Sequence, residues 1–318
     1  MQQIKESGIR LSRMTLGTVQ LGMPYGVANT TGKPDETNSF RILDEAVRGG
    51  INCFDTAIGY GESERVLGSY FSGKEKPIIV SKLSLAPDEN TDEADVEKRV
   101  LSQLEGSLER LELDKIPVML LHTPHALLRY GRAVTKAFEK AVRDGYAERM
   151  GISFGAEPEE RFRELWAFAR EDVYEAVQIP LNIFDHRLLR AGALELMSDA
   201  GKTVFVRSVF LQGLLTMEPD RLPEHLAGAG KYLVTLQKLA DREGMSVQEL
   251  AVAFVRGLPG VHSLVVGAET PEQVRANVRM IDATSSISEE TRHDILQAFS
   301  QVPEYLISPH LWNARKTS

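Results

Sequence analysis

Four side chains suited to proton transfer follow one another along the first half of the chain. They are a carboxylate, a phenol, an ammonium and an imidazole: Asp55, Tyr60, Lys82 and His122. A phenol can give its proton to a carbonyl oxygen, and a neighbouring ammonium stabilises the phenolate that remains. A carboxylate keeps that ammonium charged in a partly desolvated site, and an imidazole can orient the carbonyl by a hydrogen bond. The set therefore suits reduction of a carbonyl with Tyr60 as general acid, or the reverse oxidation with Tyr60 as general base.

Each of these residues also has a simpler structural explanation when it is taken alone. Asp55 could cap a loop, Tyr60 could be a rim aromatic, and Lys82 a solvated lysine. His122 could be a hydrogen-bonded core histidine. The chemical interpretation is favoured because the four residues end, or closely follow, three consecutive apolar segments.

Those segments belong to a longer pattern in which apolar runs rich in Val and Ile alternate with amphipathic stretches. Continuous apolar strands with intervening helices are typical of a parallel sheet that is covered on its faces. Eight such units in one chain predict a closed (β/α)8 TIM barrel, whose carboxyl strand ends meet at one mouth. The predicted strands are residues 14–19, 51–56, 77–82, 116–122, 149–154, 176–180, 203–209 and 263–267.

The segments at the two ends of the chain are predicted to lie at opposite ends of this barrel. Residues 4–11 read as a β-hairpin that plugs the bottom, and residues 302–312 follow the last helix and reach the other end. A chain of 318 residues could also hold two ordinary domains. No composition break or linker divides it, and residues 59–64 lack the last glycine of a Rossmann fingerprint. We therefore expect residues 1–318 to form a single barrel domain.

Composition limits the class of protein. With 42% hydrophobic and 26% charged residues the chain falls in the globular range, and 37 Lys and Arg against 45 Asp and Glu give a net charge of −8. This acidic balance and the lack of a basic cluster argue against nucleic acid. No long apolar run and no signal peptide are present, so no membrane partner is expected. The single cysteine, Cys53, fits the cytoplasm and no metal site. Nothing in the sequence indicates the oligomeric state.

From residue 9 to about residue 281, the sequence resembles the aldo-keto reductases. The tetrad of that family is matched in order and spacing by Asp55, Tyr60, Lys82 and His122. The opening at 16–22 (LGTVQLG), followed by Tyr25 and Gly26, is similar to that of a bacterial subgroup. Further similar positions are Gly17, Thr18, residues 151–153, Gln178, and the segment from Val266 to Asn277.

The resemblance implies a nicotinamide dinucleotide that lies across the barrel mouth without a Rossmann domain. Ser153 and Gln178 would hold its carboxamide. The sequence at Thr270–Gln273 independently predicts a capped helix start with proline at its first position, which can bind phosphate or be a capped helix and nothing more. The implied cofactor-binding residues are Thr18, Val19, Asp55, Ser153, Gln178, Arg207, Ser208, Leu211, Gln212, Gly267, Gln273 and Asn277.

The chain departs from the family pattern at three positions. Phe154 stands where members commonly have asparagine, which puts one carboxamide contact in doubt. Arg207 stands where many have an aromatic that stacks on the nicotinamide; a guanidinium can stack and bind an anion, or form a buried ion pair. Glu269 stands near the expected 2′-phosphate, where it would repel NADPH. The family resemblance favours NADPH as the cofactor, and NADH is the alternative.

The predicted function is reduction of an aldehyde or ketone, such as a sugar or a small aromatic carbonyl. One alternative is an NAD-dependent aldose or alcohol dehydrogenase that works oxidatively, and another is a cofactor-binding sensor with little turnover. Candidate substrate contacts are Tyr25, Tyr60, His122 and Trp312, and further mouth-loop candidates are Phe184 and His310.

Overall fold

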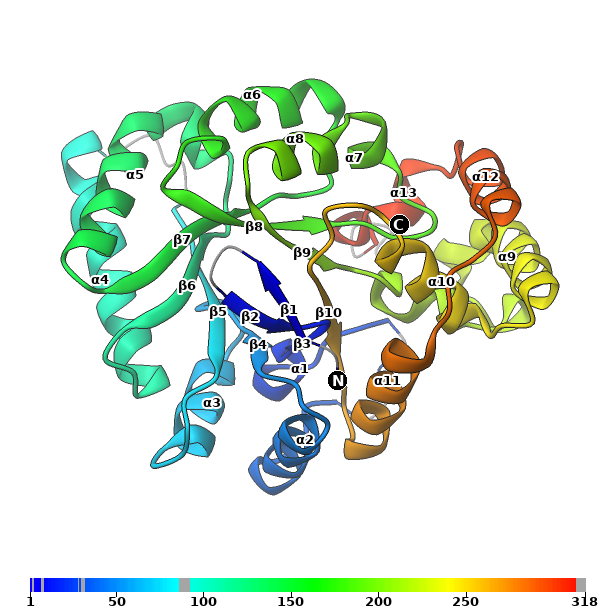
Figure 1. Ribbon diagram of the computed structural model, residues 1–318, viewed down its shortest axis with the longest axis horizontal. Helices are drawn as coiled ribbons and strands as arrows, with labels where there is room; N and C mark the ends of the chain where they lie inside the picture. The colour runs from blue at the N-terminus through cyan, green and yellow to red at the C-terminus, as the bar shows by residue number, and fades with distance from the viewer. Residues whose placement is uncertain (2, 7–8, 28, 30–31, 86–91, 313–318) are drawn as a thin grey trace.

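Eight parallel strands close into a barrel in the computed structural model of the protein (Figure 1). The structure describes residues 1–318 except 2, 7–8, 28, 30–31, 86–91 and 313–318. The strands are hydrogen-bonded in the order β10-β3-β4-β5-β6-β7-β8-β9, so the predicted TIM barrel and its eight strands are confirmed. Their bounds are β3 Met14–Gly17, β4 Cys53–Asp55, β5 Ile78–Leu83, β6 Ile116–Leu121, β7 Ala147–Ser153, β8 Tyr174–Pro180, β9 Thr203–Arg207 and β10 Ser263–Gly267.

Helices surround the barrel on its outer side (Figure 1). The α-helices are α1 Val19–Gly22, α2 Glu36–Arg48, α3 Ser63–Phe71, α4 Glu93–Leu111, α5 Ala126–Arg143, α6 Glu159–Ala169, α7 Arg187–Arg190, α8 Ala193–Asp199, α9 Gly230–Glu243, α10 Val247–Arg256, α11 Pro271–Ala283, α12 Glu289–Ala298 and α13 Glu304–Ile307. Short 3-10 helices are η1 Leu211–Thr216, η2 Pro219–Arg221, η3 Glu224–Ala229 and η4 Pro309–Leu311. Among the described segments, no helix is both long and apolar enough to cross a lipid bilayer.

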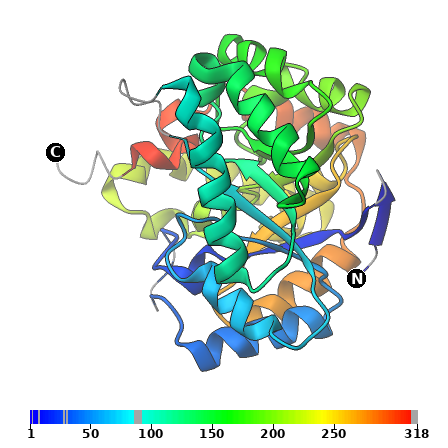
Figure 2. The same cartoon turned by 90° about the vertical axis from the view of Figure 1, so that its left-hand side faces the viewer.

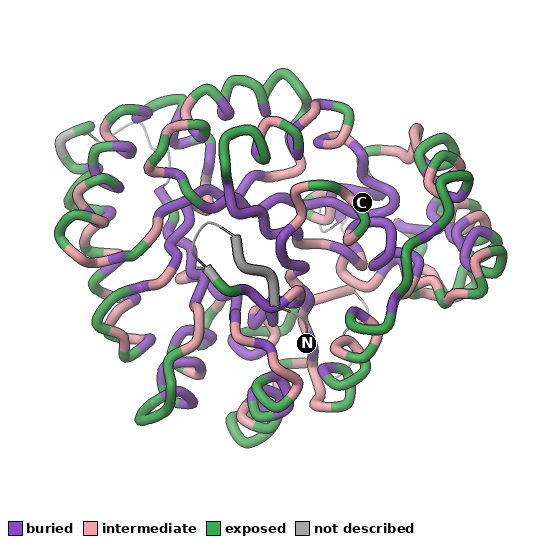
Figure 3. The backbone as a smooth tube through the Cα atoms, in the orientation of Figure 1, coloured by how far each residue is buried: buried purple, intermediate pink, exposed green. Residues whose placement is uncertain are grey.

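Alternation along the strands explains why they are apolar on both faces. In β6, Val118 and Leu120 point into the barrel, where they pack with Leu11, Cys53 and other interior residues. Met119 and Leu121 belong instead to the large cluster between the barrel and the helices. The barrel strands are accordingly buried over most of their length, apart from exposed positions such as Glu148 and Glu175 near their amino ends, while the outer helix faces are exposed (Figure 3). A continuous Val/Ile/Leu run is therefore what this architecture requires.

The N-terminal hairpin and the described C-terminal segment, up to Trp312, lie at opposite ends of the barrel, as the sequence predicted (Figure 2). The hairpin of β1 (Gln3–Glu6) and β2 (Ile9–Ser12) is antiparallel and leads directly into the amino end of β3. Leu11 from β2 is 2% exposed and fills the bottom of the barrel interior. At the carboxyl end, α13 and η4 return over the mouth. There Arg187 donates to the carbonyl of Ile307 (3.3 Å) and the hydroxyl of Ser308 (3.2 Å), which fixes the returning segment.

Candidate active site

A buried ion pair lies at the carboxyl ends of β4 and β5. The Nζ of Lys82 is 2.6 Å from Oδ2 of Asp55 and also donates to the carbonyl of Thr56 at 2.8 Å. The side chains of Lys82 and Asp55 are 0% and 5% exposed. A buried ammonium is tolerated only with a counter-ion and hydrogen-bond acceptors, and both are present. The site therefore contains a buried ammonium group, held in place by Asp55 and by the carbonyl of Thr56.

Tyr60 lies above this charge, in the turn that follows β4. Its ring centroid is 5.0 Å from Nζ of Lys82. The turn is held by close packing of two loops: a Cβ at Gly22 would overlap the carbonyl oxygen of Tyr60. A Cβ at Gly61, whose φ is +56°, would overlap the carbonyl of Gly22. Two glycines thus permit the backbone contact that sets the position of the phenol.

His122 follows β6, and its ring faces that of Tyr60. The two ring centroids are 5.9 Å apart, with an interplanar angle of 83°. Burial, followed by the positive charges of Lys82 and Arg207, lowers the pKa of His122 to about 4. The imidazole is therefore neutral at pH 7, and a neutral ring can donate one hydrogen bond to a carbonyl oxygen. The structure brings all four residues of the predicted tetrad together at one mouth.

A groove of about 550 Å³ runs over this tetrad and along the mouth. Besides Asp55, Tyr60 and His122, its lining includes most of the predicted cofactor residues, namely Val19, Arg207, Ser208, Gln212, Gly267, Gln273 and Asn277. Thr18 does not line it, because its hydroxyl donates to the carbonyl of Asp55 (2.8 Å) and contacts the hydroxyl of Ser63 (2.7 Å). Leu211 and Ser153 line two neighbouring cavities instead, and Gln178 lines none of them. Thr18 thus supports the strands beneath the groove.

The two residues predicted to hold a carboxamide are neighbours with unused polar atoms. Ser153 and Gln178 pair in register across β7 and β8. Gln178 donates from Nε2 to Oδ2 of Asp55 at 2.7 Å. The hydroxyl of Ser153 and Oε1 of Gln178 are buried and have no hydrogen-bond partner among the described residues. Buried polar atoms without partners are costly. A carboxamide, which carries a donor and an acceptor, would satisfy both, so these residues fit the nicotinamide end of a dinucleotide.

The loop after β9 is strained, and the sequence did not reveal this. Ser208, Leu211 and Gln212 have positive φ angles of 64°, 48° and 54°. Such angles cost free energy in residues other than glycine and are common at ligand-binding sites. Gln212 is held across the mouth by two contacts: its Nε2 donates to the Tyr25 hydroxyl (3.0 Å), and its carbonyl accepts from Val27 N (3.2 Å).

At the far end of the groove the predicted helix start is present. Thr270 caps α11 by accepting a hydrogen bond from the backbone of Gln273 (3.2 Å), and Pro271 is the first helical residue. The capping box differs in detail, because the Gln273 side chain accepts from the backbone of Glu269 (2.7 Å) instead of reaching the cap. Arg275 points away and binds Glu45 in two places, both at 3.1 Å.

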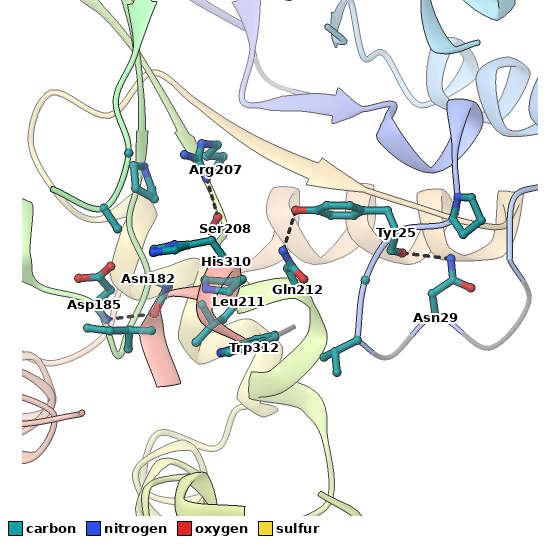
Figure 4. Close-up of a pocket in the computed structure, with 18 of the residues that line it drawn as sticks. Tyr25, Asn29, Asn182, Asp185, Arg207, Ser208, Leu211, Gln212, His310 and Trp312 are labelled. Carbon is teal, nitrogen blue, oxygen red and sulfur yellow. Dashed lines mark hydrogen bonds between the residues drawn. The ribbon is translucent and has the colours of Figure 1, made fainter. Parts of the chain in front are cut away.

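A second cavity of about 650 Å³ opens beside the groove (Figure 4). It shares Tyr25, Arg207 and Gln212 with the groove and is closed by Trp312 and His310 from the C-terminal segment. Two of the predicted substrate residues, Tyr25 and Trp312, thus line this cavity, and Tyr60 and His122 line the groove. The other lining residues are Met23, Pro24, Gly26, Val27, Asn29, Gly32, Gly155, Ala156, Pro180, Asn182, Asp185, Ser208, Leu211, His225, Ile307 and Pro309.

Sequence reasoning missed several polar residues of this mouth. Gln20 lines the groove and His225 the larger cavity, and the buried Oε1 of Gln20 and Nε2 of His225 have no hydrogen-bond partner within the described part of the chain. Asn182 follows β8 and could have been found from its strand-end position, whereas His225 comes from η3 and carried no signal. Phe184, expected at the mouth, is 1% exposed and packs on Phe299 with ring centroids 4.7 Å apart.

Arg207 does not form the ion pair that the sequence left open as an alternative. It donates to the carbonyl of Phe154 (3.0 Å) and to the hydroxyl of Ser208 (3.3 Å). Within the described part of the chain it contacts no carboxylate.

Comparison with known proteins shows the family to which the chain belongs. The sequence model described as the Aldo/keto reductase family matches residues 13–297. The chain is 28% identical over 297 residues to the aldo-keto reductase YhdN of Bacillus subtilis (strain 168), covering 86% of each protein. It is 26% identical over 317 residues to a protein of Oryza sativa subsp. japonica named a probable voltage-gated potassium channel subunit beta, covering 91% of this chain and 93% of that one.

Two solved structures have the same fold. The aldo-keto reductase AKR11C1 from Bacillus halodurans, in its holo form, superposes with a TM-score of 0.75 at 24% identity, over 97% of this chain and 100% of that one. The glycerol dehydrogenase AKR11B4 from Gluconobacter oxydans superposes with a TM-score of 0.72 at 25% identity, over 95% of this chain and 97% of that one.

Proposed function

Because the chain belongs to the aldo/keto reductase family of oxidoreductases, we propose that it reduces an aldehyde or ketone to the alcohol with a nicotinamide dinucleotide. The observation that carries the proposal is the buried pair of Lys82 and Asp55 beneath the ring of Tyr60, with a neutral His122 facing that ring. The bound cofactor would supply hydride to the carbonyl carbon. The chain itself has to bind the carbonyl, polarise it and deliver a proton to its oxygen.

In this proposal Tyr60 is the proton donor and the other three residues support it. The phenol donates to the carbonyl oxygen and passes its proton over as negative charge develops there. Lys82, 5.0 Å from the ring centroid, stabilises the phenolate, and Asp55 holds Lys82 in place. The neutral His122 donates a second hydrogen bond to the same oxygen, which orients the carbonyl without adding a mobile charge.

Ser153 and Gln178 would hold the carboxamide of the cofactor. Their unpartnered buried atoms support this assignment, and Gln178 also links the carboxamide site to Asp55 through its 2.7 Å hydrogen bond. The strained loop at 208–212 and the amino end of α11 would face the diphosphate, because free backbone N–H groups at a helix start bind anions.

For the cofactor preference we propose NADH over NADPH, which reverses the order that the family resemblance suggested. Among the described residues that line the groove, those at the α11 end are Gln248, Glu269, Gln273 and Asn277, and none is a lysine or arginine. Arg275, the nearest cation on the first turns of α11, is bound to Glu45. A 2′-phosphate would meet the negative charge of Glu269, whereas a ribose hydroxyl can donate to it.

Fluorescence titration with both cofactors tests this preference. We expect tighter binding of NADH, and several-fold tighter NADPH binding in Glu269→Gln. Glu272→Gln is the matched control, because Glu272 lies on the same helix start but outside the groove lining. Tighter NADPH binding by the wild-type protein would overturn the order.

Two other functions have support from the similar proteins. One structural neighbour is a glycerol dehydrogenase, which favours oxidation, and one relative is named a channel subunit, which favours a cofactor sensor. Rates with a panel of aldehydes, ketones, sugars and the corresponding alcohols, followed at the NADH absorbance band near pH 7, separate the three functions. Faster reduction supports the proposal, faster oxidation supports a dehydrogenase, and cofactor binding without turnover in either direction supports a sensor.

A further inference from the structure

Arg207 occupies the place where the cavities of the mouth meet. It lines the groove over the tetrad, the larger cavity, and a third cavity of about 440 Å³ beside His122. Figure 4 shows it at the end of β9, with Ser208 next to it. Two observations indicate that Arg207 binds an anion: the direction of its side chain, and the absence of a carboxylate partner among the described residues.

The guanidinium extends from β9 towards β7, away from the amino end of α11 and towards the side of the mouth where Ser153 would hold the carboxamide. From β9 it donates to the carbonyl of Phe154, which directly follows β7, so it passes over β8. The amino end of α11 lies on the opposite side, after β10, which is the other neighbour of β9. Arg207 therefore faces the larger cavity, whose walls include Gly155, Pro180 and Asn182.

The charge of Arg207 is not balanced by the protein. Two of its N–H groups donate to the neutral oxygens of Phe154 and Ser208, and the others have no acceptor among the described residues. The nearby acids are already paired. Asp55 is bound by Lys82, and Asp185 is bound by Arg187 at 2.9 and 2.8 Å.

Two further acids line the mouth, Glu269 at the α11 end of the groove and Glu157, and neither is bound to Arg207 among the described residues. Glu157 lines the third cavity, where it lies 3.4 Å from His125. Among the described residues that line the larger cavity, Asp185 is the one acid and is bound by Arg187, and the buried Nε2 of His225 has no hydrogen-bond partner in the described part of the chain. A partly buried cation in such surroundings costs free energy until an anion binds it. In an acidic chain of net charge −8, this cavity is therefore a local positive site.

We infer that the substrate carries an anionic group, a carboxylate or a phosphate, which Arg207 binds in the larger cavity while the carbonyl meets Tyr60 and His122. This inference rests on the proposed carbonyl reduction. A planar guanidinium binds either oxyanion through parallel N–H groups, and a lysine would not reproduce that geometry. Arg207 and His122 line the same groove and the same third cavity, so one small molecule can bring its anionic group to Arg207 and its carbonyl to His122.

Two pairs of aldehydes, each with an anionic and a neutral member, test the inference; the members of the first pair are also matched in size. The first pair is 4-carboxybenzaldehyde and 4-formylbenzamide, and the second is glyceraldehyde 3-phosphate and glyceraldehyde. The amide withdraws electrons more strongly than the carboxylate, so intrinsic reactivity alone would favour the neutral aromatic substrate. We expect kcat/KM to be about 10- to 100-fold higher for the anionic member of at least one pair, and the pair that shows it identifies carboxylate or phosphate.

Variants at position 207 then assign the preference to this residue. In Arg207→Met the ratio of kcat/KM between the anionic and neutral members should fall to near one, and in Arg207→Lys it should fall only in part. Arg279→Met is the matched control, since Arg279 is an exposed arginine of α11 outside the three cavities, and it should keep the wild-type ratio. Dissociation constants for NADH and NADPH are measured for each variant.

The outcomes separate this inference from the function on which it rests. Turnover of neutral aldehydes at least as fast as of their anionic partners overturns the anion site and leaves carbonyl reduction standing. A variant Arg207→Met that keeps the wild-type ratio but binds both cofactors more weakly places Arg207 on the cofactor and also overturns the inference. Absence of turnover with every aldehyde and both cofactors overturns the proposed function, and the anion site with it.

Discussion

The two ends of the barrel are built on opposite principles. At the amino end, Leu11 from the hairpin fills an interior of apolar side chains, and the polar groups of Ser12 and Asn52 are hydrogen-bonded to each other. At the carboxyl end, a buried ion pair lies below unpartnered atoms of Ser153 and Gln178 and beside a loop with positive φ angles. The amino end contributes mainly stability, whereas the carboxyl end keeps, beside a strained loop, unsatisfied groups that a ligand can satisfy.

The largest difference between the ends is expected from Tyr60→Phe. Removing the phenolic hydroxyl removes the proton donor while the ring keeps its packing against His122. We expect kcat to fall by about 10²- to 10⁴-fold, with the dissociation constant for the cofactor and the unfolding midpoint close to wild type. Steady-state kinetics, cofactor titration and thermal unfolding check the three parts. Near wild-type turnover in this variant would remove Tyr60 from its assigned role.

The reverse result is expected at the amino end from Leu11→Ala. This change leaves a cavity in the barrel interior and should lower the free energy of unfolding by about 3 kcal/mol, with kcat per folded molecule unchanged. Urea unfolding measures the first quantity and turnover the second. Leu128→Ala is the control, because Leu128 is 39% exposed and should lose far less stability. A loss of kcat as large as that in Tyr60→Phe would contradict the division between the ends.

The buried His122 at the carboxyl end of the barrel should also lower the free energy of unfolding in acid. The pKa of His122 is lowered from 6.5 to about 4 by burial first, so the unfolded chain binds a proton between these values and the folded chain does not. Stability is therefore lost as the pH falls from about 6.5 towards 4. The loss from this residue is about 2 kcal/mol between pH 7 and pH 5. His186, whose pKa burial also lowers to about 4, adds to it.

His122→Asn separates the contribution of His122 from that of His186. Urea unfolding at pH 7 and pH 5 should show a smaller pH-dependent loss in this variant than in wild type, by about 2 kcal/mol. An unchanged loss would show that His122 is not the group that resists protonation.

The smallest effect expected is a trade of cofactor affinity for stability at Ser153. In Ser153→Ala a buried hydroxyl without a partner disappears, so the free energy of unfolding should stay level or rise by about 1 kcal/mol. Affinity for the cofactor should fall about 3- to 10-fold. Ser39→Ala is the matched control: among the described residues its hydroxyl is also buried without a partner, but it lies on α2 and lines none of the three cavities, whereas Ser153 lines the third. If both variants bound the cofactor as wild type does, Ser153 would have no part in the carboxamide site.

Much of the barrel and its tetrad could be predicted from the sequence alone. The period of apolar residues in β6 and its neighbours follows from burial on both faces, and residues that end successive parallel strands must meet. Asp55, Lys82 and His122 were therefore found from local pattern, because β4, β5 and β6 are adjacent in the chain and in the sheet.

Only the tertiary structure decided which partners the polar groups of the mouth have. The bond from Gln178 to Asp55, the strap between Gln212 and Tyr25, and the binding of Arg275 by Glu45 each join segments far apart in the chain. Arg207 likewise contacts a distant segment, at the carbonyl of Phe154, and has no carboxylate partner among the described residues. Apolar burial has a period that can be read along a chain, whereas a hydrogen bond depends on the distance and angle between two particular atoms, which only the closed barrel sets.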